Sequence, residues 1–128
     1  MVVKNLNSTF RLVCGCGDWL KHWRRFGKPT PGFAEGQKCA VVLCPNPLEV
    51  GAHVQKELLQ GLRVLGMAGD RSWYVLPLCR ACSLKRGASL VVEDGCGLAP
   101  ASIDETCGRA PTGEWHPEGN PDSQKIFL

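Results

Sequence analysis

Apolar residues recur at helical spacing near the N-terminal end of the chain. The apolar positions of this stretch are Trp19, Leu20, Trp23 and Phe26. Asp18 is a suitable N-cap and Gly27 a suitable end, so we predict a helix over residues 18–27. The positions between the apolar ones carry cations, which gives this helix one aromatic side and one basic side.

Short runs of β-branched and aromatic residues predict strands. The runs are Val50–Val54, Trp73–Leu78, Ser89–Val92 and a weaker one, Phe10–Val13. We predict a helical turn from Cys79 to Arg86, a linker over residues 27–37, and a short helix or lid over the leucines between 58 and 65. Short helices mixed with short strands place the chain in the α+β class.

The length of the chain limits how its fold can be stabilised. A chain of 128 residues buries a modest core, and 15 glycines and nine prolines leave little room for long regular elements. Chains of this kind rely on disulfides or metal ions, and eight cysteines supply either. We predict one zinc-stabilised domain over residues 1–108 and a flexible acidic tail over residues 109–128.

The start of the chain and its hydropathy favour metal over disulfides. The opening residues, MVVKNLNSTFR, lack the apolar stretch of about 7–15 residues typical of a secretory signal. No run of about 18 apolar residues is present, so we predict no membrane-spanning segment. We therefore expect an intracellular, cytoplasmic protein in a reducing compartment, where close cysteine pairs bind metal more often than they form disulfides.

Two cysteine pairs have the spacing of a tetrahedral metal site. Cys39 and Cys44 lie in a loop that runs into proline, and Cys79 and Cys82 form a CxxC where a predicted strand meets a predicted helix. The start of a helix favours thiolates through its dipole and its free N–H groups. We predict that these four residues bind one structural zinc ion, because four thiolates leave no open position for a substrate. The alternative is that the cysteines are small apolar core residues.

The segments VGAHV and YVLPLCRACSLKRG give residues 38–88 a resemblance to the HNH endonucleases, which have a treble-clef fold with a structural zinc. His53 stands where that family has a histidine near the end of its first strand. The start of the family's metal-bearing helix and a basic residue beyond it are matched by Pro77, Leu78, Cys79, Cys82 and Lys85. The resemblance implies a treble clef, also called a ββα-metal fold, in which His53 is the general base that activates a water molecule.

Three positions around the family's catalytic histidine differ in this chain. Tyr74 stands in place of an asparagine, Ser83 in place of an asparagine or histidine, and Ala52 in place of an acidic residue. Such neighbours hold the divalent metal at the scissile phosphate, so the resemblance implies the fold more strongly than nuclease activity. Two hypotheses therefore stand for His53: a catalytic base, or a histidine of the core or of the shell around the metal.

A second group of potential ligands surrounds the predicted helix. Cys14 and Cys16 form a CxC, and His22 follows six residues after Cys16. Either Cys96 or Cys107 would complete the set. The stretches CGCG, WYVLPLC and TCG are similar to small uncharacterised prokaryotic and phage proteins of treble-clef type, and this similarity favours Cys107. The predicted second zinc site comprises Cys14, Cys16, His22 and Cys107; the alternatives are free thiols beside a solvated histidine, or a metal ion shared among the cysteines in a different way.

Charge is distributed unevenly along the chain. Residues 1–90 carry 13 Lys and Arg against five Asp and Glu, a net charge of +8, whereas residues 91–128 carry two against seven, a net charge of −5. The residues that we predict to contact nucleic-acid phosphates are Lys21, Arg24, Arg25, Lys28, Lys85 and Arg86. The alternative for the predicted helix is that its aromatic side packs in the core while its cations are merely solvated.

Three functions are consistent with these residues. The first is a structural-zinc module that binds nucleic acid through its basic face. The second is an adaptor or inhibitor that binds a protein partner, with the terminal Ile126, Phe127 and Leu128 as a docking peptide. The third is a metal-dependent endonuclease of HNH type that uses His53. No serine–histidine arrangement, phosphate-binding glycine loop or paired-carboxylate signature indicates a small-molecule substrate.

Overall fold

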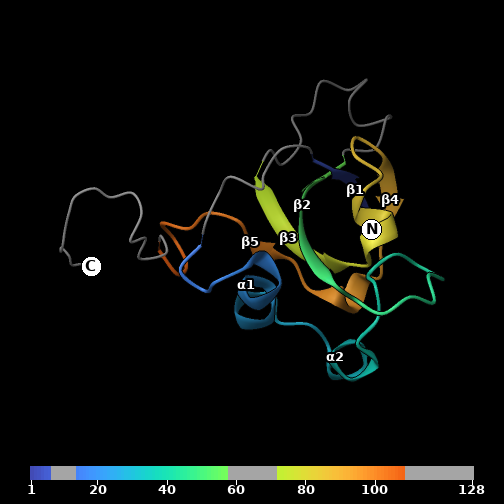
Figure 1. Ribbon diagram of the computed structural model, residues 1–128, viewed down its shortest axis with the longest axis horizontal. Helices are drawn as coiled ribbons and strands as arrows, with labels where there is room; N and C mark the ends of the chain where they lie inside the picture. The colour runs from blue at the N-terminus through green and yellow to red at the C-terminus, as the bar shows by residue number, and fades with distance from the viewer. Residues whose placement is uncertain (7–13, 58–71, 109–128) are drawn as a thin grey trace.

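The computed structural model describes residues 1–6, 14–57 and 72–108. Within these ranges the chain is α+β, with one antiparallel sheet and a few short helices (Figure 1). The strands lie in the order β4-β1-β2-β3-β5. Their bounds are Val2–Asn5 for β1, Val50–Lys56 for β2, Trp73–Leu78 for β3, Ser89–Val91 for β4 and Ala99–Pro100 for β5. The helices are α1 (Trp19–Phe26), α2 (Pro31–Gly36) and α4 (Arg80–Ser83), with a 3₁₀ turn η1 at Asp94–Cys96.

The centre of the sheet is the antiparallel pair of β2 and β3, which the sequence predicted. β3 has the predicted bounds, and β2 continues two residues past the predicted end, to Lys56. The register sets His53 opposite Val75. Because side chains alternate along a strand, His53 and Val75 share one face of the sheet, whereas Val54 and Leu76 share the other.

The two faces of the sheet carry separate parts of the core. On one side, which we call the α1 face, Val75 packs with Trp23 of α1 and Ala99 of β5. On the other side, which we call the loop face, a larger cluster includes Val54, Leu76, the N-cap Cys79 of α4 and Cys82 within α4. Figure 1 shows α1 beside β3 and β5, with β4 and the start of the chain at the other edge of the sheet.

Helix α1 has the predicted position and ends. The Asp18 carboxylate accepts a hydrogen bond from the Lys21 backbone N–H at 2.8 Å, and the helix ends where the Gly27 N–H donates to the Trp23 carbonyl. The Trp23 side chain is 1 % exposed, and its indole N–H donates to the carbonyls of Cys96 and Gly97. The aromatic side of α1 is therefore part of the core, as the alternative interpretation expected, and its cations are exposed.

Glycine allows α1 to lie this close to the sheet. A Cβ atom on Gly51 of β2 would stand 2.3 Å from the carbonyl carbon of Trp19, a distance that non-bonded atoms do not adopt. The contact is with backbone, which has no rotamer by which to move aside. Gly51 thus fixes the distance between α1 and the sheet.

Three segments differ from the sequence prediction. The predicted linker 27–37 contains α2, which begins because Thr30 caps it through its hydroxyl and Pro31 occupies the first turn. The first residues of the chain, for which we predicted no strand, contain β1, an inner strand that pairs with both β2 and β4. β5 forms in the glycine- and proline-rich region after Asp94. The predicted strand Phe10–Val13, the helix or lid over 58–65 and the tail 109–128 lie outside the described residues.

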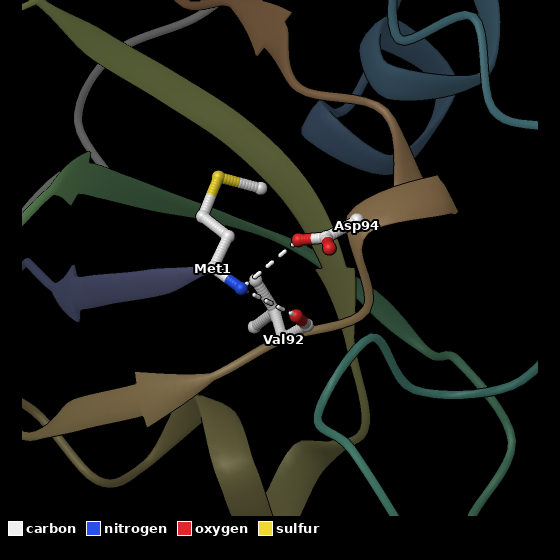
Figure 2. A network of polar contacts seen from close by, with 3 residues as sticks. All are labelled: Met1, Val92 and Asp94. Carbon is white, nitrogen blue, oxygen red and sulfur yellow. Dashed lines mark hydrogen bonds and ion pairs between the residues drawn. The ribbon is translucent and has the colours of Figure 1, made fainter.

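Contacts distant in sequence hold both ends of β1. At its start the Met1 nitrogen donates to the Asp94 carboxylate at 3.0 Å and to the Val92 carbonyl at 3.3 Å (Figure 2). At its other end the buried Asn5 amide donates to the carbonyls of Ser83 and Lys85, both at 3.0 Å. These bonds tie β1 to α4 and to the segment that follows β4.

Candidate metal centres

Four cysteines converge at the end of the β2–β3 pair, on the loop face. We call this group cluster A; it consists of Cys39, Cys44, Cys79 and Cys82. Their four sulfur atoms lie within 4.8 Å of one another. This is the set of residues that the sequence predicted for the first metal site, and the structure brings all four together.

A tight loop over residues 38–47, which we call the Cys loop, presents the first pair. The Cys39 N–H donates to the Asn46 carbonyl at 3.0 Å, and the Cys44 N–H donates to the Val41 carbonyl at 3.1 Å. Leu43, at the tip, adopts a φ of +65° and is 94 % exposed. The loop therefore turns back on itself and directs both sulfurs toward the sheet.

The second pair lies at the start of α4. Cys79 is the N-cap, and its sulfur accepts from the Cys82 N–H at 3.4 Å and from the Asn46 amide at 3.6 Å. Asn46 is a contact that sequence reasoning missed, because an amide between two prolines reads as an ordinary turn residue. The distance between the Cys44 and Cys79 sulfurs is 3.9 Å, close to the edge of about 3.8 Å that follows from tetrahedral metal–sulfur bonds of about 2.3 Å.

The thiols of cluster A differ in acidity. Burial opposes ionisation of Cys79, but the hydrogen bonds from Cys82 and Asn46 outweigh it and lower the pKa to about 7. Burial raises the pKa of Cys39, and burial together with the Cys79 sulfur raises the pKa of Cys82 to about 12. One thiolate therefore forms easily, and its negative charge opposes ionisation of the neighbouring thiols. A bound cation would allow all four thiols to ionise.

A second group of ligands lies on the α1 face. We call it cluster B; it consists of Cys14, Cys16, His22 and Cys107. The four ligand atoms again lie within 4.8 Å of one another, and the set is the one predicted from the sequence. Cys14 and Cys16 precede α1, His22 is on it, and Cys107 arrives from the segment after β5. The backbone bond from the Gly15 N–H to the Gly108 carbonyl, at 2.7 Å, joins the two ends.

The orientation of His22 suits metal binding. Its Nε2 lies 2.7 Å from the Pro100 carbonyl oxygen, which can only accept, so Nε2 carries the proton and Nδ1 holds the lone pair. Nδ1 points into cluster B, 3.4 Å from the Cys107 sulfur and 4.0 Å from the Cys16 sulfur. A tetrahedral ion with metal–nitrogen and metal–sulfur bonds of about 2.0 and 2.3 Å requires a separation of about 3.5 Å.

Acidity within cluster B follows the same pattern as in cluster A. Burial opposes ionisation of Cys107, but hydrogen bonds from the Cys16 side chain and from the backbone of Gly15 and Cys16 lower its pKa. Burial and the neighbouring Cys107 raise the pKa of Cys16 to about 11, although the Arg25 guanidinium, 4.0 Å from its sulfur, acts in the opposite direction. Burial also raises the pKa of Cys14.

Cys96 belongs to neither cluster. It is fully buried, and burial raises the pKa of its thiol to about 11. Its backbone carbonyl accepts from Trp23, and its side chain belongs to the core cluster of the loop face. The choice of Cys107 over Cys96 agrees with the grouping in the structure.

His53 is a core residue in this structure. It is 2 % exposed, and its ring packs edge-on against Trp19 with the centroids 4.3 Å apart. Burial, with a smaller effect from His22, lowers its pKa to about 4. Its Nε2 has no hydrogen-bond partner among the described residues. The ring has no exposed path to a phosphate, so its position gives the catalytic hypothesis no support.

The predicted phosphate-binding residues fall into two groups on different parts of the surface. Lys21, Arg24, Arg25 and Lys28 are exposed along and just after α1. Lys85 and Arg86 are exposed after α4, whose Cys82 belongs to the core of the loop face. The structure therefore does not gather all six cations into one surface.

No family model matches this chain, and neither do any curated proteins or solved structures. In the described ranges no helix combines the length and apolarity needed to cross a bilayer.

Proposed function

We propose that the chain is a structural module with two zinc ions, one in cluster A and one in cluster B, and that the basic side of α1 binds the phosphate backbone of nucleic acid. The observation that carries the metal assignment is the convergence of eight sulfur and imidazole ligands into two separate groups of four. Soft thiolates with at most one imidazole, at tetrahedral spacing, favour zinc over magnesium or calcium, which prefer oxygen ligands.

The residues fit zinc at both positions. Cluster A would supply four thiolates and cluster B three thiolates and the Nδ1 of His22, so neither leaves an open position. Bound zinc would supply charge compensation and a cross-link, and no step of a reaction is assigned to it. The order Cys loop, β2–β3 hairpin, α4 is the order of a treble clef, which supports that interpretation of residues 38–88. It remains a proposal, as does kinship with HNH proteins.

The nucleic-acid part of the proposal depends on the surface of α1. Lys21, Arg24 and Arg25 lie at positions i, i+3 and i+4 of one helix, so they share a side, and Lys28 follows directly. Because Trp23 is buried and Trp19 packs against His53 and His22, neither tryptophan ring of α1 offers a free face for a base. We therefore expect contacts to phosphates, with little preference for sequence.

Two measurements test the proposal. Native mass spectrometry should find two zinc ions per chain. Binding to a DNA duplex should weaken with salt, and the Lys21→Gln, Arg24→Gln double variant should lower the slope of log K against log[salt] by about 2, one phosphate contact per lost cation.

The matched control for this test is the Lys85→Gln, Arg86→Gln double variant, which removes the same charge from the other surface. Equal slopes in both double variants would mean that overall charge, and not the α1 surface, drives binding. An affinity that does not change between low and high salt would reject phosphate contact altogether.

A further inference from the structure

Cluster B differs from cluster A in how its sulfurs meet solvent. In cluster B two cysteines, Cys16 and Cys107, are partly exposed, whereas Cys14 and His22 are buried. In cluster A only Cys44 is partly exposed. Cluster B therefore has two partly exposed cysteines, and cluster A has one.

The sulfurs of these two partly exposed cysteines are also close in space. They lie within 4.8 Å of each other. Cys16 lies in the turn before α1, and Cys107 lies in the irregular segment after β5. A disulfide needs the sulfurs about 2.0 Å apart, so one of these segments must shift by a few ångströms. Neither sulfur belongs to a helix or strand that would resist that shift.

A cation stands beside one of the two sulfurs. The Arg25 guanidinium is 4.0 Å from the Cys16 sulfur, and Arg25 is exposed. A fixed positive charge beside a thiolate stabilises the negative charge that passes to a leaving hydroxide. Arg24, one residue earlier, is also exposed, but its guanidinium donates to the Gln37 side chain at 3.1 Å.

We infer that Cys16 and Cys107 form a peroxide-oxidised site through which cluster B, and not cluster A, releases its metal ion; this rests on the proposed zinc function. The Cys16 thiolate attacks hydrogen peroxide: an S–O bond forms, the O–O bond breaks, and hydroxide leaves and takes a proton to become water. The Cys107 thiolate then attacks the sulfenic sulfur, an S–S bond forms, the S–O bond breaks, and a second hydroxide leaves as water. Two thiolates, one peroxide and two protons thus give one disulfide and two waters, and the ion in cluster B loses two of its four ligands.

The experiment uses the full chain loaded with zinc and titrated with hydrogen peroxide. Released zinc is followed with a chromophoric chelator, and cysteines are mapped by differential alkylation and mass spectrometry. The expected result is release of one zinc per chain, a Cys16–Cys107 disulfide, and four protected cysteines in cluster A. Thiol reductant with added zinc should restore the starting state.

Arg25→Gln and Arg24→Gln give a matched pair of exposed variants that leave all ligands in place. Loss of the charge 4.0 Å from Cys16 should slow zinc release by about fivefold, since a unit charge at that distance in water contributes about 1 kcal/mol. Arg24→Gln should release zinc at the original rate. Equal rates in the two variants, release of both ions together, or a first disulfide within cluster A would overturn the proposal.

The zinc content measured before peroxide is added distinguishes failure of this proposal from failure of the proposed function on which it rests. A starting content of one zinc, with Cys14, Cys16 and Cys107 open to alkylation, refutes the two-site function and this proposal with it. A starting content of two, followed by release from cluster A, refutes this proposal alone.

Discussion

Clusters A and B have the same number of ligands but occupy different positions in the fold. Cluster A joins the Cys loop to the end of the central hairpin, and three of its cysteines belong to the main core of the loop face. Cluster B lies outside the sheet and joins a turn, a helix and the segment after β5. The comparison indicates that cluster A is part of the scaffold, whereas cluster B fastens elements that the scaffold already positions.

The largest expected effect is the difference between two single variants, one that removes a ligand from cluster A and one that removes a ligand from cluster B. We expect Cys82→Ser to abolish cooperative folding, because it would remove the structural zinc that we propose for cluster A, and binding of such an ion supplies about 10–16 kcal/mol in small zinc domains. We expect Cys107→Ser to lose one zinc and to retain the sheet, since β1 to β4 do not depend on cluster B for their pairing. Zinc content and thermal unfolding followed by near-UV circular dichroism measure both effects.

Cys96→Ala is the control for that pair, because it removes a buried cysteine that belongs to neither cluster. It should keep two zinc ions and lose only the stability expected of a small core truncation. If Cys107→Ser unfolded the chain as completely as Cys82→Ser, cluster B would be as necessary for folding as cluster A, and the difference inferred between the two clusters would be wrong.

The next largest effect tests how α1 reaches the sheet. A methyl group at Gly51 would overlap the Trp19 backbone, so we expect Gly51→Ala to lower the free energy of unfolding by about 3 kcal/mol, the upper part of the usual overpacking range. It should weaken cluster B, which contains His22 of α1, and leave cluster A loaded. Denaturant unfolding and zinc stoichiometry after limited chelation provide the measurements.

Gly32→Ala supplies the comparison for Gly51→Ala. A Cβ on Gly32, in α2, would meet no atom within 4 Å, so this substitution should leave stability unchanged or slightly higher. A loss of stability as large as that of Gly51→Ala would mean that glycine flexibility, and not the space beneath α1, sets the effect.

The sequence predicted those parts of the molecule whose signals are local. α1 was predictable because its cap, its apolar spacing and its terminal glycine lie within ten residues. Cluster A was predictable because a CxxC at a strand-to-helix junction places two sulfurs together by local geometry. β3 was predictable from its run of aromatic and β-branched residues.

The parts that spacing alone could not reveal depend on contacts between distant residues. β1 is four residues long and is a strand because β2 and β4 flank it, far along the chain. His22 and Cys107 are 85 residues apart, so only resemblance favoured Cys107 over Cys96. The Pro100 backbone carbonyl fixes the proton of His22 on Nε2. A backbone acceptor of this kind cannot be recognised from the pattern of side chains along the sequence.

The smallest expected effect concerns His53, which lies beneath α1 and close to cluster B. Its pKa is about 4 when folded, against about 6.5 when unfolded, because burial first and His22 second disfavour the charged ring. The unfolded chain therefore binds more protons between these values. Stability is fully present above pH 6.5 and falls as the pH drops toward 4, by about 1.4 kcal/mol at pH 5.5.

His53→Leu removes both the titration and the Nε2 atom that has no partner among the described residues. We therefore expect it to match or exceed the original stability at pH 7.5 and to lack the fall of about 1.4 kcal/mol at pH 5.5. Denaturant unfolding of both proteins at the two pH values measures the difference, and zinc content at each pH shows whether metal loss contributes. A parallel fall in both proteins would place the acid sensitivity in the cluster ligands. A large loss for His53→Leu at pH 7.5 would mean that the Nε2 atom has a partner outside the described residues. The first result would leave His53 as a tolerated core histidine, whereas the second would make it a residue that the α1 face requires.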